Sequence, residues 1–350
     1  MDQMEVIENT RQTRKIQLSG GSTYIISLPK NWIDEMKIKV GENITIVKNS
    51  NQSLTLFPQN RDNKEKNTIA IIPSSNKEPG EAIKRKIIAA YLAGYKTMKV
   101  QSKGMRIPVD HSKSIKELVR SSMIGTEIVE SSSESIAIQV LTRLPDLSFS
   151  TALKRMYLMT NTMIKEAIEA FLAGDVTHSE EVINMDDEVD RFGLYMRRNL
   201  VLAVGNEKSL QEIGLRKPSD CLGYRSIVTR IERIADHASL IAKKTKFLEN
   251  QIDAKIFEKI KKLSEKSLEV FEKSIEAVEE NDFDKGEKVA EKVKAVIEEE
   301  KQIMNKINNN DKNVTIIKFV LEDIRRIAEY SGDIAEVAID ENIQNIISEE

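Results

Sequence analysis

Cysteine is nearly absent from this sequence, which has one, Cys221, in 350 residues. A single thiol excludes an internal disulfide framework and is typical of a reducing compartment. Aromatic residues make up only 5% of the chain, which favours an aliphatic, helix-rich protein over an all-β one. No apolar run approaches the roughly 18–20 residues that a membrane helix needs. We therefore expect a cytoplasmic protein without stable membrane insertion.

Familiar catalytic motifs are also missing. The sequence has no glycine-rich phosphate loop, no G-x-S-x-G pattern and no H-E-x-x-H pattern. The Glu-x-x-His pairs of helical di-iron oxidases are absent too, since Ala235 stands three residues after Glu232. These absences argue against the common hydrolase, nucleotide-binding and metalloprotease sites. We expect a protein that is not an enzyme.

Charge is plentiful but unevenly placed. Residues 1–67 hold ten basic against eight acidic side chains, and residues 68–145 hold twelve against seven. The total net charge is -3, so residues 146–350 carry a net charge of -10. The front of the chain therefore suits an anionic partner, and the back suits cations. The length allows two or three domains, each with its own core.

Patterns typical of short strands dominate residues 14–57. Apolar residues alternate at period two around Gly20-Gly21 and again around 49–51, and Pro29 opens a short helix between the two hairpins. A segment of about fifty residues with so little regular structure cannot bury a stable core alone. We expect residues 10–58 to form a domain that dimerises.

The order strand, proline, short helix, basic-Val-Gly-acid, strand in SLPKNWIDEMKIKVGENITI resembles the AbrB (SpoVT/AbrB) family of DNA-binding domains. The resemblance implies a swapped-hairpin β-barrel made by two interleaved chains, hence a homodimer with DNA as its partner. That family presents basic residues near its first strand, and the matching DNA-binding candidates are Arg11, Arg14, Lys15 and Lys30. Residues 11–48 hold seven basic against three acidic side chains, which suits contacts with phosphates. The alternative is a dimerisation module with a solvated basic rim.

A polar linker, residues 59–67, precedes a second pattern. Runs typical of strand, helix, strand, helix, strand and strand follow one another over residues 68–143. This order predicts a small α/β sandwich, in which we find no catalytic constellation. We expect a regulatory or spacer role for it, and we expect His111, at the start of the second helix, to belong to a cap.

Helical periodicity dominates the rest of the chain and repeats itself. RIERIADHASLIAKK at 230–244 aligns with DIRRIAEYSGDIAEVA at 323–338. Turns rich in Gly, Asn, Asp and Pro divide the region into segments of helical length. We predict an all-α bundle over residues 148–345, built from two three-helix repeats at about 148–247 and 255–345.

Two helices of the first repeat carry acidic pairs beside apolar stripes. Asp186 and Asp190 lie one helical turn apart, as do Glu232 and Asp236. A carboxylate buried without a counter-charge costs several kcal/mol, so a positive group should face these residues. Two antiparallel helices that carry such pairs at matching depth can present four carboxylates to a hard cation. The alternative is a set of ordinary surface salt bridges.

The segments DDEVD and IERIADHASLIA resemble the two metal motifs of the PhoU family of phosphate-uptake regulators. The resemblance implies a twofold-repeated helical bundle that holds a metal ion, iron, zinc or manganese, on its surface. The metal ligands that it carries over are Asp186, Asp190, Glu232 and Asp236. Asp187 and His237 are auxiliary candidates, although His237 points away from Glu232 on a helix.

The second repeat departs from this pattern. Arg325 stands where Glu232 stands in the first repeat, and Glu329 stands where Asp236 does. Glu329 and Asp333 form an acidic pair that is shifted by one turn. An arginine beside carboxylates can substitute for the charge of a metal. We therefore expect one well-formed metal site and a second one that is weakened or lost.

These resemblances together predict a DNA-binding regulator of phosphate uptake and cellular phosphate homeostasis, in which a metal-binding bundle acts on a DNA-binding dimer. The alternative is an adaptor that does not bind DNA and docks on a phosphate transporter or a histidine kinase. In the adaptor, residues 10–58 would serve only to dimerise. The basic cluster of Arg11, Arg14 and Lys15 separates the two hypotheses, because only the regulator needs it.

Overall fold

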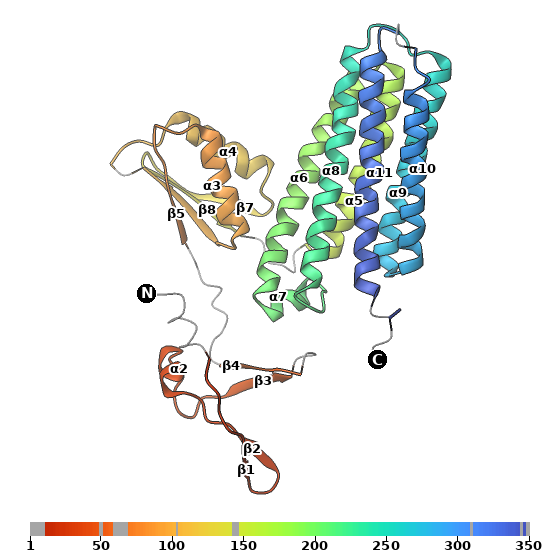
Figure 1. Cartoon of the computed structure of the whole chain (residues 1–350). Coiled ribbons are helices and arrows are strands. Elements are labelled where there is room, and N and C mark those ends of the chain that lie inside the picture. The colour runs from red at the N-terminus through yellow and green to blue at the C-terminus, as the bar shows by residue number, and fades with distance from the viewer. Residues whose placement is uncertain are drawn as a thin grey trace. The chain divides into compact units, whose positions relative to one another are not determined.

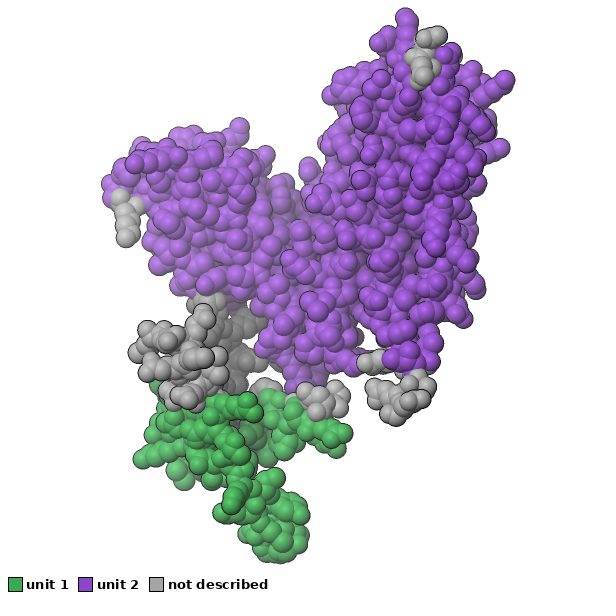
Figure 2. All heavy atoms as spheres, viewed as in Figure 1, with its two compact units in different colours: residues 1–67 green, residues 68–350 purple. Residues whose placement is uncertain are grey.

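The structure is a computed structural model, and it describes residues 11–48, 52–58, 69–102, 104–141, 147–308, 311–343 and 346–347. The predicted turn at 49–51 and the predicted linker at 59–67 lie outside these residues. The chain divides into two compact units, Met1–Asn67 and Thr68–Glu350, which are drawn in different colours in Figure 2.

Unit 1 consists of two antiparallel hairpins and one short helix. The first hairpin pairs β1 (Gln17–Ser19) with β2 (Thr23–Ile25), and the second pairs β3 (Ile44–Lys48) with β4 (Leu54–Pro58). The turn of the first hairpin uses positive φ angles at both glycines, 61° at Gly20 and 79° at Gly21, which only glycine adopts without strain. The helix α2 (Lys30–Glu35) begins directly after Pro29, as predicted.

Unit 1 has almost no interior of its own. Among its described residues only Pro29 is buried. Large apolar side chains that the alternation would place in a core are instead exposed, for example 74% for Tyr24, 62% for Ile46 and 67% for Leu54. Since Ile46 is opposite Leu56, and Lys48 is opposite Leu54, one face of the second hairpin gathers three exposed apolar side chains. This face needs a cover that one chain does not provide.

Unit 2 begins with a four-stranded sheet whose order is β5-β6-β8-β7. Its elements are β5 (Ile69–Pro73), α3 (Gly80–Leu92), β6 (Thr97–Gln101), α4 (Val109–Ser121), β7 (Thr126–Ser131) and β8 (Ser135–Val140). β5 is parallel to β6, and the other two pairings are antiparallel. Both helices lie on one face of the sheet (Figure 1), where Ile83, Ile87 and Ile115 pack on Met98 and Ile138. This is the element order predicted from the sequence.

One side chain of this α/β region has a different role from the predicted one. The N-cap of α4 is Pro108, so His111 does not cap that helix. Instead the buried His111 ring lies 2.8 Å from Ser74 Oγ through Nδ1 and 2.8 Å from the Glu78 carbonyl oxygen through Nε2. It ties the segment after β5 to α4, and the cap expectation was wrong.

The remainder of unit 2 is an antiparallel helical bundle (Figure 1). Its elements are α5 (Phe149–Ala173), α6 (Val176–Val204), α7 (Glu207–Glu212), α8 (Asp220–Lys244), the short 3-10 helix η2 (Thr245–Phe247), α9 (Ala254–Glu280), α10 (Phe283–Met304) and α11 (Val314–Asn342). Helix starts are fixed by side-chain caps: Ser148, Asp175, Asp253 and Asp282 each accept a hydrogen bond from a backbone N–H of the first turn. None of the helices that the structure describes is long and apolar enough to cross a membrane.

The bundle is internally duplicated. Helices α5, α6 and α8 form the first repeat, and α9, α10 and α11 form the second; α7 is an extra turn in the first. The last helices of the two repeats, α8 and α11, pack along each other in the middle. At their contact the rings of His237 and Tyr330 lie 5.7 Å apart, and Arg230 forms an ion pair with Asp333 at 2.9 Å.

Helix α6 also contacts the α/β region. Arg198 is buried, and its guanidinium donates hydrogen bonds to the carbonyl oxygens of Tyr91 and Gly94 at the C-terminal end of α3. It also stacks over the Tyr91 ring at 4.6 Å. The Tyr91 carbonyl also accepts a hydrogen bond from Gly94 N–H at 3.1 Å, and a cation at the C-terminal end of a helix is favourable. Leu194, one turn earlier on α6, joins the hydrophobic core of the α/β region.

Candidate cation site on the helical bundle

The four predicted acidic ligands lie on neighbouring helices. Asp186 and Asp190 are on α6, while Glu232 and Asp236 are on α8, which packs against α6. The two helices hold their positions through Val182, Val189, Ile231 and Ala235, all fully buried in the bundle core. Glu232 is itself buried, at 8% exposure, Asp186 and Asp236 are half-buried, and Asp190 reaches solvent.

Burial first, and neighbouring carboxylates second, raise the pKa values of Glu232, Asp190 and Asp186. Burial raises the pKa of Glu232 to about 7; the nearby Arg197 lowers it, while Asp190 and Asp236 add to the rise. Loss of solvent around the carboxylate raises the pKa of Asp190 to about 6, and the charges of Asp186 and Asp236 add to the rise. The pKa of Asp186 is raised by burial first and by Asp236 second. The charge of Asp236 contributes to the raised pKa values of all three.

Their polar atoms are incompletely satisfied within the structure. Asp186 Oδ1 and the Ser239 hydroxyl are buried and form no well-aligned hydrogen bond, although the hydroxyl lies near enough to Asp186 to lower its pKa. Glu232 Oε1 makes none either, but it forms an ion pair with Arg197 at 2.9 Å. An unpartnered buried carboxylate oxygen costs free energy that a cation would recover.

A glycine makes room for the buried carboxylate. A Cβ atom on Gly193 would overlap the Glu232 carboxylate, so the bare backbone of α6 forms one wall of the space that Glu232 fills. The residue has no positive φ angle that would require glycine. Close approach of Glu232 is therefore the physical reason for a glycine here.

The donor set suits a hard cation, although the side chains do not yet surround one. Carboxylate oxygens on facing helices are typical ligands of metals such as manganese and iron. Within the described residues, no three His, Cys, Asp or Glu side chains converge closely enough to hold a metal ion as they stand. Binding would need rotamer changes, for which Asp190 at the solvent edge has freedom.

The auxiliary candidates behave differently from the four ligands. Asp187 is exposed. His237 lies 2.9 Å from Asp323 through Nδ1, on the side of α8 that faces the second repeat. Lys244 pairs with the same buried aspartate at 2.6 Å. His237 thus belongs to the contact between the repeats, in line with its predicted direction away from Glu232.

The second repeat replaces the acidic site with apolar packing and arginines. Asp175 and Asp282 are the N-caps of α6 and α10, so Asp186 corresponds to Val293 and Asp190 to Ile297. Val293 packs beside Gly332, which matches Ser239 in the first repeat.

The remaining acids of the second repeat are neutralised by arginines. Arg325 lies between Glu300 at 3.7 Å, Glu322 at 3.6 Å and Glu329, which it also binds by a hydrogen bond. Asp333 pairs with Arg230. Glu329 and Asp333 therefore already have counter-charges within the chain, as the sequence comparison of the repeats indicated.

The predicted DNA-binding residues belong to unit 1. Arg11, Arg14, Lys15 and Lys30 are all exposed. Arg14 donates a hydrogen bond to Gln12 at 2.7 Å, and among the residues that the structure describes none of the four forms an ion pair with an acid. Their charges are thus available to an anionic partner.

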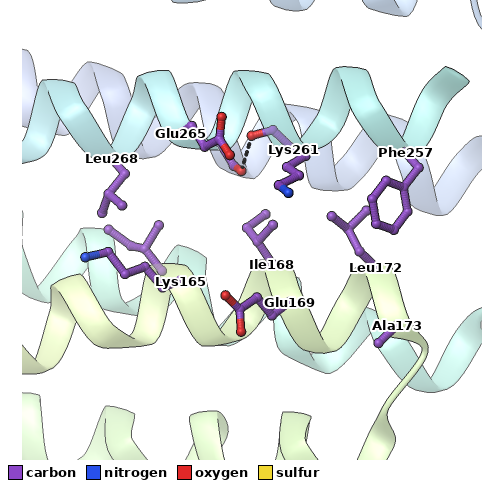
Figure 3. A pocket seen from close by; sticks show the side chains of 11 residues that line it. Lys165, Ile168, Glu169, Leu172, Ala173, Phe257, Lys261, Glu265 and Leu268 are labelled. Carbon is purple, nitrogen blue, oxygen red and sulfur yellow. Dashed lines mark hydrogen bonds between the residues drawn. The ribbon is translucent and has the colours of Figure 1, made fainter. Parts of the chain in front are cut away.

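A groove elsewhere on the bundle brings none of these residues together. It has a volume of about 400 Å³ and lies between α5 and α9, the first helices of the two repeats. Ile168, Leu172 and Phe257 face the space between the helices, and Lys165 and Glu265 lie along it (Figure 3). It is a seam between the repeats, separate from the acidic site.

Sequence reasoning missed the arginines that complete these sites. Arg197 and Arg198 are adjacent, yet one binds Glu232 and the other binds the end of α3. Both arginines follow an acidic stretch on the same helix. Surface helices commonly have this pattern, so it does not indicate a buried role. A signal that could have found Arg198 is its position between the apolar residues Met196 and Leu200, on a buried stripe.

A duplicated helical bundle with acidic pairs on one repeat, joined to a small strand-rich unit, defines a modular protein of a regulatory class. Residues 153–245 and 260–338 each match the PhoU domain, and the helical half of this chain belongs to the PhoU family. Residues 17–64 match the antidote-toxin recognition domain of the bacterial antitoxin MazE, so unit 1 is a MazE/AbrB-like domain. Both resemblances drawn from the sequence are confirmed.

Two solved structures are similar to the helical half. PhoU from Pseudomonas aeruginosa is 18% identical, with 57% of this chain and 96% of that chain covered and a TM-score of 0.46. The phosphate transport system regulatory protein PhoU from Streptococcus pneumoniae is also 18% identical, with the same coverage and a TM-score of 0.45. No curated protein matches the chain.

Proposed function

We propose that this chain is a non-enzymatic, DNA-binding regulator of phosphate uptake and phosphate homeostasis that works as a homodimer through residues 10–58. The observation that carries the proposal is that unit 1 leaves exposed the large apolar side chains that would normally form its core. A domain whose Tyr24, Ile46 and Leu54 are largely exposed, and whose described residues bury only Pro29, lacks the core that stability requires. A second copy of the same hairpins would supply it.

DNA is the partner that unit 1 suits. Arg11, Arg14 and Lys15 precede or open the first strand, and Lys30 begins α2, all with exposed side chains. A twofold dimer would double this set to eight cations on one body. Lysine and arginine contacts with phosphates release counterions, which makes such binding steeply dependent on salt.

The bundle is the part that would sense the regulatory signal. We infer that Asp186, Asp190, Glu232 and Asp236 hold a metal ion, iron, zinc or manganese, with Asp187 as a further candidate; Glu329 and Asp333 are weaker candidates because arginines already pair with them. When bound, the ion would supply the positive charge that these carboxylates lack. The incompletely satisfied carboxylate of Asp186 and the raised pKa values of Asp190 and Glu232 support this.

A route from the cation site to the rest of unit 2 exists within α6. Arg197 faces Glu232 of the site, and the next residue, Arg198, holds the C-terminal end of α3. A signal of this kind acts only if the ligand binds two conformations with different affinity. Membership in the PhoU family supports phosphate status as that signal, and a phosphate transporter or a histidine kinase as a further partner.

A measurement of DNA binding tests the proposal. The full chain should retard duplex DNA in a gel shift at low salt, and the binding constant should fall steeply as salt is raised. The double variant Arg14→Glu/Lys15→Glu should lose at least tenfold in affinity and show a shallower salt dependence. Lys37→Glu/Lys39→Glu, two exposed reversals between α2 and β3 with the same total change in charge, is the matched control and should lose less.

The opposite outcome has a definite meaning. If DNA binding is absent, or is equally affected by both substitutions while the chain remains a dimer, the regulator is wrong. The adaptor that docks on a transporter or kinase then becomes the better description, because unit 1 would serve only to dimerise.

A further inference from the structure

The two edges of the four-stranded sheet in unit 2 are built differently. β7 forms one edge and carries Glu127 and Glu130 together with a register shift between Ile128 and Glu130. Charged side chains and bulges are the devices with which proteins prevent an edge strand from pairing with another chain. β7 is therefore a protected edge.

β5 forms the other edge and has none of these devices. Its sequence is IAIIP, without a charged residue, and it pairs regularly with β6 from Ile69 to Pro73. Among the described residues no other strand pairs with it. Pro73, which lacks an N–H, stands at the very end of the strand and leaves the rest able to pair.

The outward side chains of β5 are also apolar. Ile69 and Ile71 are 56% and 66% exposed on the face of the sheet that α3 and α4 do not cover, whereas Ile72 is buried under the helices. Across the same open face the neighbours are polar: Thr97 is opposite Ile69 and Lys99 is opposite Ile71. Lys99 in turn pairs with Glu130 at 3.3 Å. The unprotected edge strand thus presents two large, exposed apolar side chains beside polar neighbours.

We propose that β5 pairs antiparallel with β5 of a second copy of this chain, so that two four-stranded sheets join into one of eight strands. Two registers pair most of the strand. One places Ile71 opposite Ile71 of the second copy, and the other places Ile69 opposite Ile71 of the second copy. Either register places isoleucines of the two copies in contact on the open face, where such cross-strand pairs stabilise a sheet. Residues on the helix-covered face stay on that face in both copies, as period two requires.

A second copy fits the edge better than an unrelated chain does. This inference rests on the proposed dimer of unit 1, which would hold two copies together. β5 begins eleven residues after β4 ends at Pro58, a length of chain that spans at most about 40 Å. Dimerisation of unit 1 would therefore keep the two β5 strands at high effective concentration. A self-complementary, uncharged strand suits such a symmetric contact.

Cysteine cross-linking of the full chain tests the pairing. In a Cys221→Ala background, which removes the single thiol, Ile71→Cys should form a covalent dimer with a short bis-maleimide. Paired or diagonal residues across such a ladder have Cβ atoms within about 8 Å of each other, within reach of that reagent. The matched control is Val129→Cys, which is 52% exposed on the protected edge β7. We expect at least ten times more covalent dimer from Ile71→Cys than from the control.

The native mass of each variant, measured alongside, separates the two proposals. A chain that is dimeric but cross-links no better at Ile71 than at Val129 overturns the β5 contact and leaves the dimer of unit 1 in place. In that case Ile69 and Ile71 would be covered by another segment of the same chain or by an unrelated partner. A monomeric chain overturns both proposals. Because both substituted side chains are already exposed, loss of folding is not expected from either one.

Discussion

At the scale of single residues, the first repeat holds more negative charge than its surroundings neutralise. Glu232 is buried beside the bare backbone of Gly193, and Arg197 is its one ion-pair partner among the described residues. Asp190 opposes the ionisation of Glu232, and Asp186 opposes that of Asp190. A protein that only needed a stable bundle would place apolar residues here, as the second repeat does with Val293 and Ile297.

This arrangement makes the stability of the metal-free protein depend on pH. The folded pKa of Asp190 is raised to about 6, so between its ordinary value and that pH the native state binds more protons than the unfolded state. The free energy of unfolding should therefore fall as pH rises through this window, and the loss should be complete above it. Asp190→Asn removes the penalty.

We expect Asp190→Asn to raise the free energy of unfolding by about 1 kcal/mol at pH 8 and to leave it unchanged at pH 4. Each unit of pKa shift corresponds to about 1.4 kcal/mol, and solvent screening at this partly exposed residue reduces the effect on the free energy of unfolding. Urea titration with a chelator present measures it, and the exposed Asp187→Asn serves as the control. An equal gain at both pH values would show that the effect is not electrostatic.

At the scale of elements, the two repeats share one arrangement of helices but differ in the side chains at the position of the acidic site. The caps Asp175 and Asp282 align α6 with α10, and this alignment places an aspartate pair on one and a valine and an isoleucine on the other. In the second repeat Arg325 replaces the acid at the position of Glu232 and pairs with the remaining carboxylates. The repeats share their fold because their apolar stripes match, while the polar residues beside the stripes diverged.

The difference between the repeats predicts where metal is held. The purified chain should contain iron, zinc or manganese by elemental analysis, and Asp190→Ala with Asp236→Ala should reduce the content at least tenfold. Glu329→Ala removes the acid of the second repeat that corresponds to Asp236, and it should leave most of the metal in place, since Arg325 and Arg326 already pair with that residue. Full occupancy in the double variant would end the metal proposal.

At the scale of the whole molecule, the two units differ in how completely they fold alone. Unit 2 buries large cores in its α/β region and its bundle, with residues such as Tyr91, Phe171 and Phe271 fully enclosed. Unit 1 leaves Ile46, Leu54 and Leu56 exposed. Association should therefore matter for unit 1 and little for unit 2, because only unit 1 depends on a partner for its core.

Dissociation of the dimer measures this dependence. We expect Ile46→Asp to weaken the dimer at least tenfold in sedimentation equilibrium, a change of about 1.4 kcal/mol, because it places a charge in the face that the second copy covers. Leu222→Asp, at an equally exposed leucine on α8 of unit 2, is the control and should leave association unchanged. Equal dissociation constants for Ile46→Asp and the unsubstituted chain would refute an interface on this hairpin.

Much of the architecture could be predicted because its signals are local. The period-two runs around Gly20-Gly21, the strand and helix order from 68 to 143, and the duplicated helices all depend on residues within a few positions of one another. The acidic pairs could be found for the same reason, since residues one turn apart share a helix face. The role of His111 could not, because its partners Ser74 and Glu78 are brought to it by the fold.

The sequence by itself determined the elements, their order, the duplication of the bundle and the four carboxylates at the centre of the candidate site. Only the tertiary structure decided which charges meet: Arg197 with Glu232, Arg198 with the end of α3, and Arg325 with the acids of the second repeat. It also decided that β5 is the unprotected edge of its sheet. The physical reason is that periodicity reports the environment of one face of one element, whereas ion pairs, close approach at Gly193 and strand order depend on which faces pack together.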